Sequence, residues 1–151
     1  MTTPILIHAS AVEMPDGAAI FLGPSGAGKS TITRLVTGAK RILADDKVWL
    51  IPKEDGTWAV ADATHRFRGD VDFDAIDAVP LRSVYRIHKS HETNVVKISE
   101  YRTWEYLIES FWELWWQRRG QPLDTASMLR RVGIAVPGYN LYFTKEGEVK
   151  T

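Results

Sequence analysis

One short stretch constrains the fold of this chain more than any other. Residues 23–30 read Gly-Pro-Ser-Gly-Ala-Gly-Lys-Ser, which fits the pattern Gly-x-x-x-x-Gly-Lys-Ser/Thr at every fixed position. In that pattern a buried strand enters a glycine-rich turn whose N–H groups point inward, and a helix follows. Residues 18–22 are apolar, and residues 31–36 carry apolar side chains at helical spacing. The sequence therefore predicts a strand, a phosphate-binding loop and a helix.

The loop is expected to hold a nucleoside triphosphate. Lys29 would reach the β- and γ-phosphates, and the hydroxyl of Ser30 would ligate the Mg²⁺ that bridges them. We therefore expect ATP and Mg²⁺ as cofactors. The residues expected to contact the nucleotide are Gly23, Pro24, Ser25, Gly26, Ala27, Gly28, Lys29, Ser30 and Thr31.

Composition narrows the class of protein. With 151 residues, 44% of them apolar, the chain is expected to form one domain over residues 1–151. Lys plus Arg and Asp plus Glu both number 19, so we expect no nucleic-acid partner. The chain has no cysteine, no signal-peptide pattern and no apolar run near the roughly 20 residues of a membrane span. We expect a cytoplasmic protein without a membrane partner.

The remaining pattern predicts an α/β fold, a P-loop domain with a mixed sheet, an N-terminal β-hairpin and flanking helices. Pro15-Asp16-Gly17 is a turn signal that predicts the hairpin. The polar residues 62–80 predict a long loop. Strands are predicted at 5–14, 18–22, 41–44, 48–51, 57–60, 81–88 and 140–144, and a long helix at 101–118.

An acidic pair is the second chemical signal. Asp45 and Asp46 follow the predicted strand 41–44, where a carboxylate that approaches a nucleotide-bound Mg²⁺ is expected. Neighbouring side chains of an extended segment face opposite ways. One carboxylate could therefore accept a proton from an attacking hydroxyl while the other holds the metal shell.

These segments together resemble the catalytic domain of HPr kinase/phosphorylase. The resemblance rests on Ile7-His8-Ala9-Ser10-Ala11, the hairpin, residues 23–30 and Leu43-Ala44-Asp45-Asp46-Lys47-Val48. It implies a short, standalone kinase-like domain of the C-terminal type. It also implies that Asp45 is the general base, that His8 lies beside the reacting phosphate, and that Asp46 lies in the magnesium shell. Because members of that family assemble as rings, a homo-oligomer is compatible with the resemblance.

The expected activity is ATP- and Mg²⁺-dependent transfer of a phosphoryl group to a hydroxyl, with a serine of a peptide or small protein as the preferred acceptor. Asp45, Lys29 and His8 are the expected catalytic residues, and Ser30 and Asp46 the expected metal ligands. Only Phe67-Arg68-Gly69-Asp70 stands for the glycine-rich signature of the resembled family, so we expect the forward reaction. The alternatives are a small-molecule, nucleotide-like kinase and a nucleotide-binding regulatory or assembly module without turnover.

For two further segments the sequence allows more than one role. The loop holds His65, Arg66, Arg68 and Asp70, which fit either a solvated loop or phosphate, metal and substrate contacts. The tryptophan-rich helix 101–118 fits the core better than an interface. Its stripe of glutamates is expected to be solvated: Glu105, Glu109 and Glu113.

Overall fold

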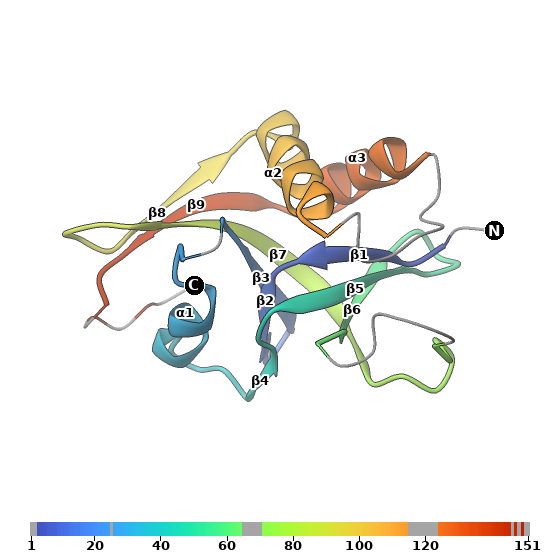
Figure 1. Cartoon of the computed structure of the whole chain (residues 1–151), viewed down its shortest axis with the longest axis horizontal. Coiled ribbons are helices and arrows are strands. Elements are labelled where there is room, and N and C mark those ends of the chain that lie inside the picture. Colours follow the sequence, from blue (N-terminus) through green and yellow to red (C-terminus); the bar gives the residue numbers. More distant parts are fainter. Residues whose placement is uncertain are drawn as a thin grey trace.

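β3 (Gly17–Leu22) is buried along its whole length, and the rest of the structure is arranged around it. In the computed structural model, residues 3–24, 26–64, 71–114, 124–145, 147 and 149 are described. Within these residues, nine strands and three helices form a mixed sheet with helices on both faces (Figure 1). The mixed α/β architecture confirms the coarse prediction.

Along the described chain, three strands precede α1, five strands follow it, and α2 and α3 come before the last strand, β9. The strands besides β3 are β1 (Ile5–His8), β2 (Ser10–Met14), β4 (Arg41–Ala44), β5 (Lys47–Pro52), β6 (Trp58–Asp62), β7 (Ala78–Lys89), β8 (Asn94–Ile98) and β9 (Gly138–Phe143). The helices are α1 (Lys29–Leu35), α2 (Glu100–Trp112) and α3 (Thr125–Ala135).

The order of the strands is β1-β5-β6-β7-β3-β2-β4, and β9 pairs with both β7 and β8. β3 and β9 are parallel to β7, whereas the other pairs are antiparallel. Because β2 runs antiparallel to both β3 and β4, β3 and β4 point the same way. The carboxyl ends of β3, β4, β7 and β9 therefore lie along one edge of the sheet.

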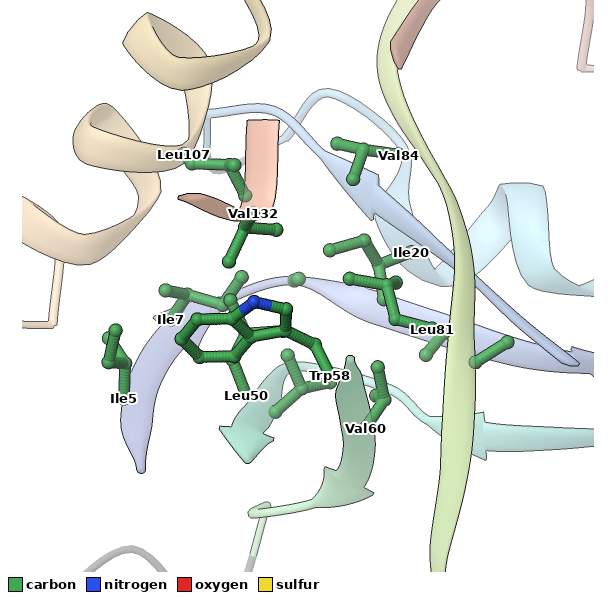
Figure 2. Close-up of a cluster of buried hydrophobic side chains, with 14 of the residues drawn as sticks. Ile5, Ile7, Ile20, Leu50, Trp58, Val60, Leu81, Val84, Leu107 and Val132 are labelled. Atoms are coloured by element: carbon green, nitrogen blue, oxygen red, sulfur yellow. The ribbon is translucent and has the colours of Figure 1, made fainter. Parts of the chain in front are cut away.

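Alternate residues of β3 pack against different helices, which explains why the strand is apolar throughout. Ile20 and Leu22 belong to the cluster covered by α2 and α3, while Phe21 belongs to the cluster covered by α1. Figure 2 shows the first cluster, where Leu107 of α2 and Val132 of α3 point toward the side chains of the sheet.

The predicted hairpin is confirmed as β2 and β3, which pair from Ser10–Phe21 to Met14–Gly17. The prediction of one continuous strand over 5–14 was wrong, since the run divides at Ala9. There the backbone N–H of Ala9 donates to the carbonyl oxygen of Asp46 at 3.0 Å, and β1 pairs with β5 instead. The second predicted hairpin is confirmed as β5 and β6.

The predicted helix over 101–118 is confirmed as α2 for residues 101–112, whereas residues 113 and 114 form a turn and residues 115–118 lie outside the described part of the chain. α2 begins after Ser99, whose side chain accepts from the N–H of Arg102, and it ends at Trp112. The N–H of Leu114 bonds to the carbonyl oxygen of Phe111 at 3.1 Å, which is a tightened turn at the helix end. Trp104 packs against the core cluster, whereas Trp112 is 58% exposed, so the expected core role holds for part of the helix.

The boundaries of two other predicted strands differ from the structure by a few residues. β7 extends beyond the predicted strand 81–88 at both ends, and β9 starts two residues before the predicted 140 and ends before 144. β8 and α3 were not predicted at all. Across the described residues, no helix combines the length and the apolar character that spanning a membrane requires.

The packing of α2 yields a prediction about stability. Leu107 is fully buried, so Leu107→Ala leaves a cavity and should lower the free energy of unfolding by about 2–5 kcal/mol. Ile42→Ala is the control, because Ile42 is 49% exposed and its truncation should have a much smaller effect. Urea unfolding of both variants measures the difference. Equal losses would contradict the assigned packing.

Candidate functional site

The loop after β3 contains two glycines whose backbone conformation excludes most other residues. Gly26 has φ +85° and Gly28 has φ +103°, both in the left-handed region. A Cβ at Gly28 would lie 2.8 Å from Cζ of Phe143 in β9, whereas nothing lies within 4 Å of a Cβ at Gly26. The loop thus packs closely on the sheet at Gly28 and has open space at Gly26.

Two hydrogen bonds hold the ends of the loop. The N–H of Ala27 donates to the carbonyl oxygen of Pro24 at 3.0 Å, which closes a turn. The buried hydroxyl of Ser10 in β2 donates to the carbonyl oxygen of Lys29 at 2.8 Å. The first turn of α1 is therefore tied to the hairpin that precedes the loop.

Lys29 is buried beneath the loop. Its ammonium group donates to the carbonyl oxygens of Gly23 at 2.6 Å and Pro24 at 3.0 Å. Burial lowers the pKa of Lys29 from its ordinary value, although the charges of Glu113 and Asp46 act in the opposite direction. The side chain of Lys29 is thus held at the base of the loop by two hydrogen bonds.

A cleft of about 320 Å³ opens above Lys29 at the carboxyl edge of the sheet. Eight of the expected site residues line it, and they come from β1, the glycine-rich loop, α1 and the turn after β4. Its lining residues are His8, Gly26, Gly28, Lys29, Ser30, Thr31, Asp45, Asp46 and Lys89. The remaining described loop residues, Gly23, Pro24 and Ala27, lie in the loop but outside this lining.

The acidic pair divides into two different environments. Oδ1 of Asp46 is 3.0 Å from Nε2 of His8, and Oδ2 accepts a hydrogen bond of 2.6 Å from Lys47. Burial raises the pKa of Asp46, but the contacts with Lys47 and His8 lower it by more than burial raises it. The pKa of Asp46 therefore lies below its ordinary value. The side chain of Asp45 is exposed and makes no hydrogen bond to any residue that the structure describes.

Glu113, at the end of α2, completes a chain of polar contacts that the sequence did not predict. Its Oε2 is 2.7 Å from Nδ1 of His8, so the imidazole ring lies between two carboxylates. Oε1 of Glu113 is buried without a hydrogen-bond partner among the described residues. The ring and both carboxylates therefore restrict one another.

The expectation of a solvated glutamate stripe was wrong at Glu113. Glu105 pairs with Arg102 on the exposed face of α2, and Glu109 pairs with Arg86 of β7 at 3.2 Å. Glu113 turns toward β1 because the last turn of α2 packs over that strand. Regular spacing along a helix does not reveal where the helix meets a neighbouring strand, so the pattern carried no signal for Glu113.

Lys89, the last residue of β7, lines the cleft and was also not predicted. Its ammonium group donates to the carbonyl oxygen of Gly26 at 2.8 Å. In the sequence it is one charge at the end of a strand, and the parallel pairing of β3 with β7 brings it to the loop.

Several predicted residues lie outside the described part of the chain. These are Ser25, His65, Arg66, Arg68, Asp70 and the last four residues of the predicted helix, 115–118. Within the described residues, no group of three or more His, Asp or Glu side chains has a metal-binding arrangement.

The fold and the cleft define a mixed α/β protein with a charged site at the carboxyl edge of its sheet. The family model described as "SynChlorMet cassette protein ScmC" matches residues 1–134. The chain therefore belongs to the ScmC family. No curated protein matches the chain.

This family match corrects the sequence-based assignment. The chain was expected to be a short member of the HPr kinase/phosphorylase family, but the matching model is that of ScmC. The segments that carried the resemblance lie within residues 7–48, and the ScmC match extends far beyond them. A phosphate-loop pattern and an acidic pair are short motifs, and short motifs recur in unrelated families.

The tight packing at Gly28 yields a testable prediction. Gly28→Ala should lower the free energy of unfolding by more than Gly56→Ala, because both residues have positive φ but only the first new methyl group meets Phe143. The backbone strain alone costs about 1–2 kcal/mol. Urea unfolding of the two variants compares them. An equal loss in both would show that the loop does not pack on β9 as described.

Proposed function

We propose that this chain binds a nucleoside triphosphate, with ATP as the expected donor, and transfers its γ-phosphoryl group to a hydroxyl. The observation that carries the proposal is the cleft itself. Residues of the glycine-rich motif line it together with Asp45, Asp46 and His8, which come from other elements. Such a cleft joins a site for phosphate groups to a site for a proton acceptor, as phosphoryl transfer requires.

The glycine-rich loop supports the binding half of the proposal. Gly26 and Gly28 have the left-handed conformations that turn successive N–H groups toward one point. Lys29 lies below them, where burial lowers its pKa and the charges of Glu113 and Asp46 partly offset that effect. On binding, its ammonium group would exchange the carbonyl oxygens of Gly23 and Pro24 for phosphate oxygens, which form stronger charge-assisted hydrogen bonds.

The donor set fits Mg²⁺. Ser30 and Asp46 both line the cleft, and both supply the oxygen ligands that Mg²⁺ prefers. Each carboxylate oxygen of Asp46 accepts one hydrogen bond and keeps further lone-pair capacity. Two protein ligands suffice, since Mg²⁺ at such sites takes its other ligands from phosphates and water. When bound, the ion neutralises charge on the phosphates.

Asp45 is the proposed general base. Its carboxylate is exposed in the cleft, so an incoming hydroxyl can reach it. As the hydroxyl proton passes to Asp45, the oxygen forms a bond to the γ-phosphorus. The bond from that phosphorus to the bridging oxygen breaks, and the nucleoside diphosphate leaves. Lys29 stabilises the negative charge that develops on the transferred group.

His8 and Glu113 are proposed to hold Asp46 in place. The ring of His8 bridges the two carboxylates at 3.0 and 2.7 Å, which restricts the rotation of Asp46. The exposed position of Asp45 favours an acceptor that approaches from the surface. We therefore propose a serine of a peptide or small protein as the acceptor.

The central experiment measures label transfer from γ-labelled ATP, with Mg²⁺, into a library of serine-containing peptides. Lys29→Ala should abolish both ATP binding and transfer, whereas Asp45→Asn should retain binding and lose transfer by at least roughly a hundredfold. Asp74→Asn is the matched control, because Asp74 is exposed and lies outside the cleft. Full transfer by Asp45→Asn would contradict the assigned base. ATP binding without transfer to any hydroxyl would indicate a regulatory nucleotide module instead.

Glu113→Gln tests the positioning chain. Glu113 does not line the cleft, so ATP affinity should change little. Transfer should slow about tenfold, because the neutral amide holds the ring of His8 less strongly. Glu105→Gln, on the exposed face of the same helix, is the control. An unchanged transfer rate in Glu113→Gln would remove Glu113 from the mechanism.

A further inference from the structure

Lys89 is the one cleft cation that lies outside the glycine-rich motif, as far as the described lining residues show. It is the last residue of β7, on the opposite side of β3 from β2 and β4. Its ammonium group donates to the carbonyl oxygen of Gly26 at 2.8 Å. A Cβ placed on Gly28 would lie 3.6 Å from Cε of Lys89, so the side-chain stem runs along the loop.

The two lysines of the cleft hold different parts of the loop. Lys29 binds the carbonyl oxygens of Gly23 and Pro24, whereas Lys89 binds that of Gly26. The two ammonium groups therefore contact different carbonyl oxygens of the same loop. Bound side by side, they would meet different phosphates of a bound chain of phosphates.

The open space around Gly26 allows a phosphate oxygen to replace the carbonyl oxygen of Gly26 as the partner of Lys89. Nothing lies within 4 Å of a Cβ placed on this residue, and the residue itself lines the cleft. A phosphate oxygen that enters there is a charged acceptor and competes well with a neutral carbonyl for an ammonium group. Lys89 can change its partner while its stem stays against Gly28, because the side chain has several rotatable bonds.

The charges of the cleft are separated in a way that suits a polyphosphate. Lys89 approaches from the β7 side of β3, while Asp45 and Asp46 approach from the β4 side. A phosphate chain over the loop therefore has a cation on one side and carboxylates on the other. A bound magnesium ion would offset the charge of those carboxylates, whereas Lys89 would bind the phosphates directly.

We propose that Lys89 is a second phosphate-binding cation, which the strand β7 adds to the site formed by the motif. The inference rests on the proposed nucleotide site and extends it to a residue outside the sequence pattern. Its ligand class is a chain of phosphates, irrespective of the nucleoside that it carries. The ammonium group leaves the carbonyl oxygen of Gly26 and donates to a phosphate oxygen when the ligand binds.

The test is a titration of the whole chain with Mg²⁺-ATP and, separately, with inorganic triphosphate. Lys89→Ala should weaken both affinities roughly 10- to 100-fold, as expected for one hydrogen bond between charged groups. Lys89→Arg should restore much of the affinity, because it keeps the charge. Lys53→Ala is the matched control, since Lys53 is an exposed lysine outside the cleft. The salt dependence of binding should also weaken in Lys89→Ala.

The outcomes separate this inference from the proposed function. If the wild-type chain binds both ligands and Lys29→Ala loses them while Lys89→Ala does not, the nucleotide site stands and the role of Lys89 is refuted. If Lys89→Ala weakens ATP but not inorganic triphosphate, Lys89 contacts the nucleoside and the inference also fails. If the wild-type chain binds neither ligand, both proposals fail.

Discussion

The burial of β3 on both faces is the constraint on which the site depends. Ile20 and Leu22 pack beneath α2 and α3, and Phe21 packs above α1, so the strand cannot shift without exposing one of two cores. Its carboxyl end is therefore held in place, and the glycine-rich loop leaves from that point. The parallel neighbour β7 and the hairpin partner β2 then bring Lys89 to one side and Asp45 to the other. The cleft is a product of strand order as much as of the motif.

Segments with a strong local pattern could be predicted from the sequence. The hairpin turn at Pro15-Asp16-Gly17 and the β5–β6 hairpin have local turn signals, and both are present. β8 lacks such a signal, because its residues 94–97 do not alternate between apolar and polar. All four are exposed in the structure, so no buried face imposes such a pattern on them. The division of the run 5–14 at Ala9 depends on pairing with β5, which is distant in the sequence. Local patterns do not contain that information.

The same distinction applies to the site. Lys29, Ser30, Asp45 and Asp46 could be predicted because short patterns specify them, and the structure brings them to one cleft. The role of Glu113 could not be predicted, because its partner His8 lies 105 residues away in the chain. The family could not be inferred either. The residues that carried the resemblance form short motifs, and short motifs do not separate one family from another.

The two adjacent aspartates are chemically different, and the difference follows from their contacts. Both lie in the bend between β4 and β5, where Asp46 is half-buried and Asp45 is exposed. Asp46 faces His8 and Lys47, whose contacts lower its pKa and make it a poor proton acceptor. Asp45 has no such contact among the described residues and remains exposed. A carboxylate whose pKa is lowered by its contacts suits a metal shell, whereas an accessible carboxylate suits a base, so the two positions are not interchangeable.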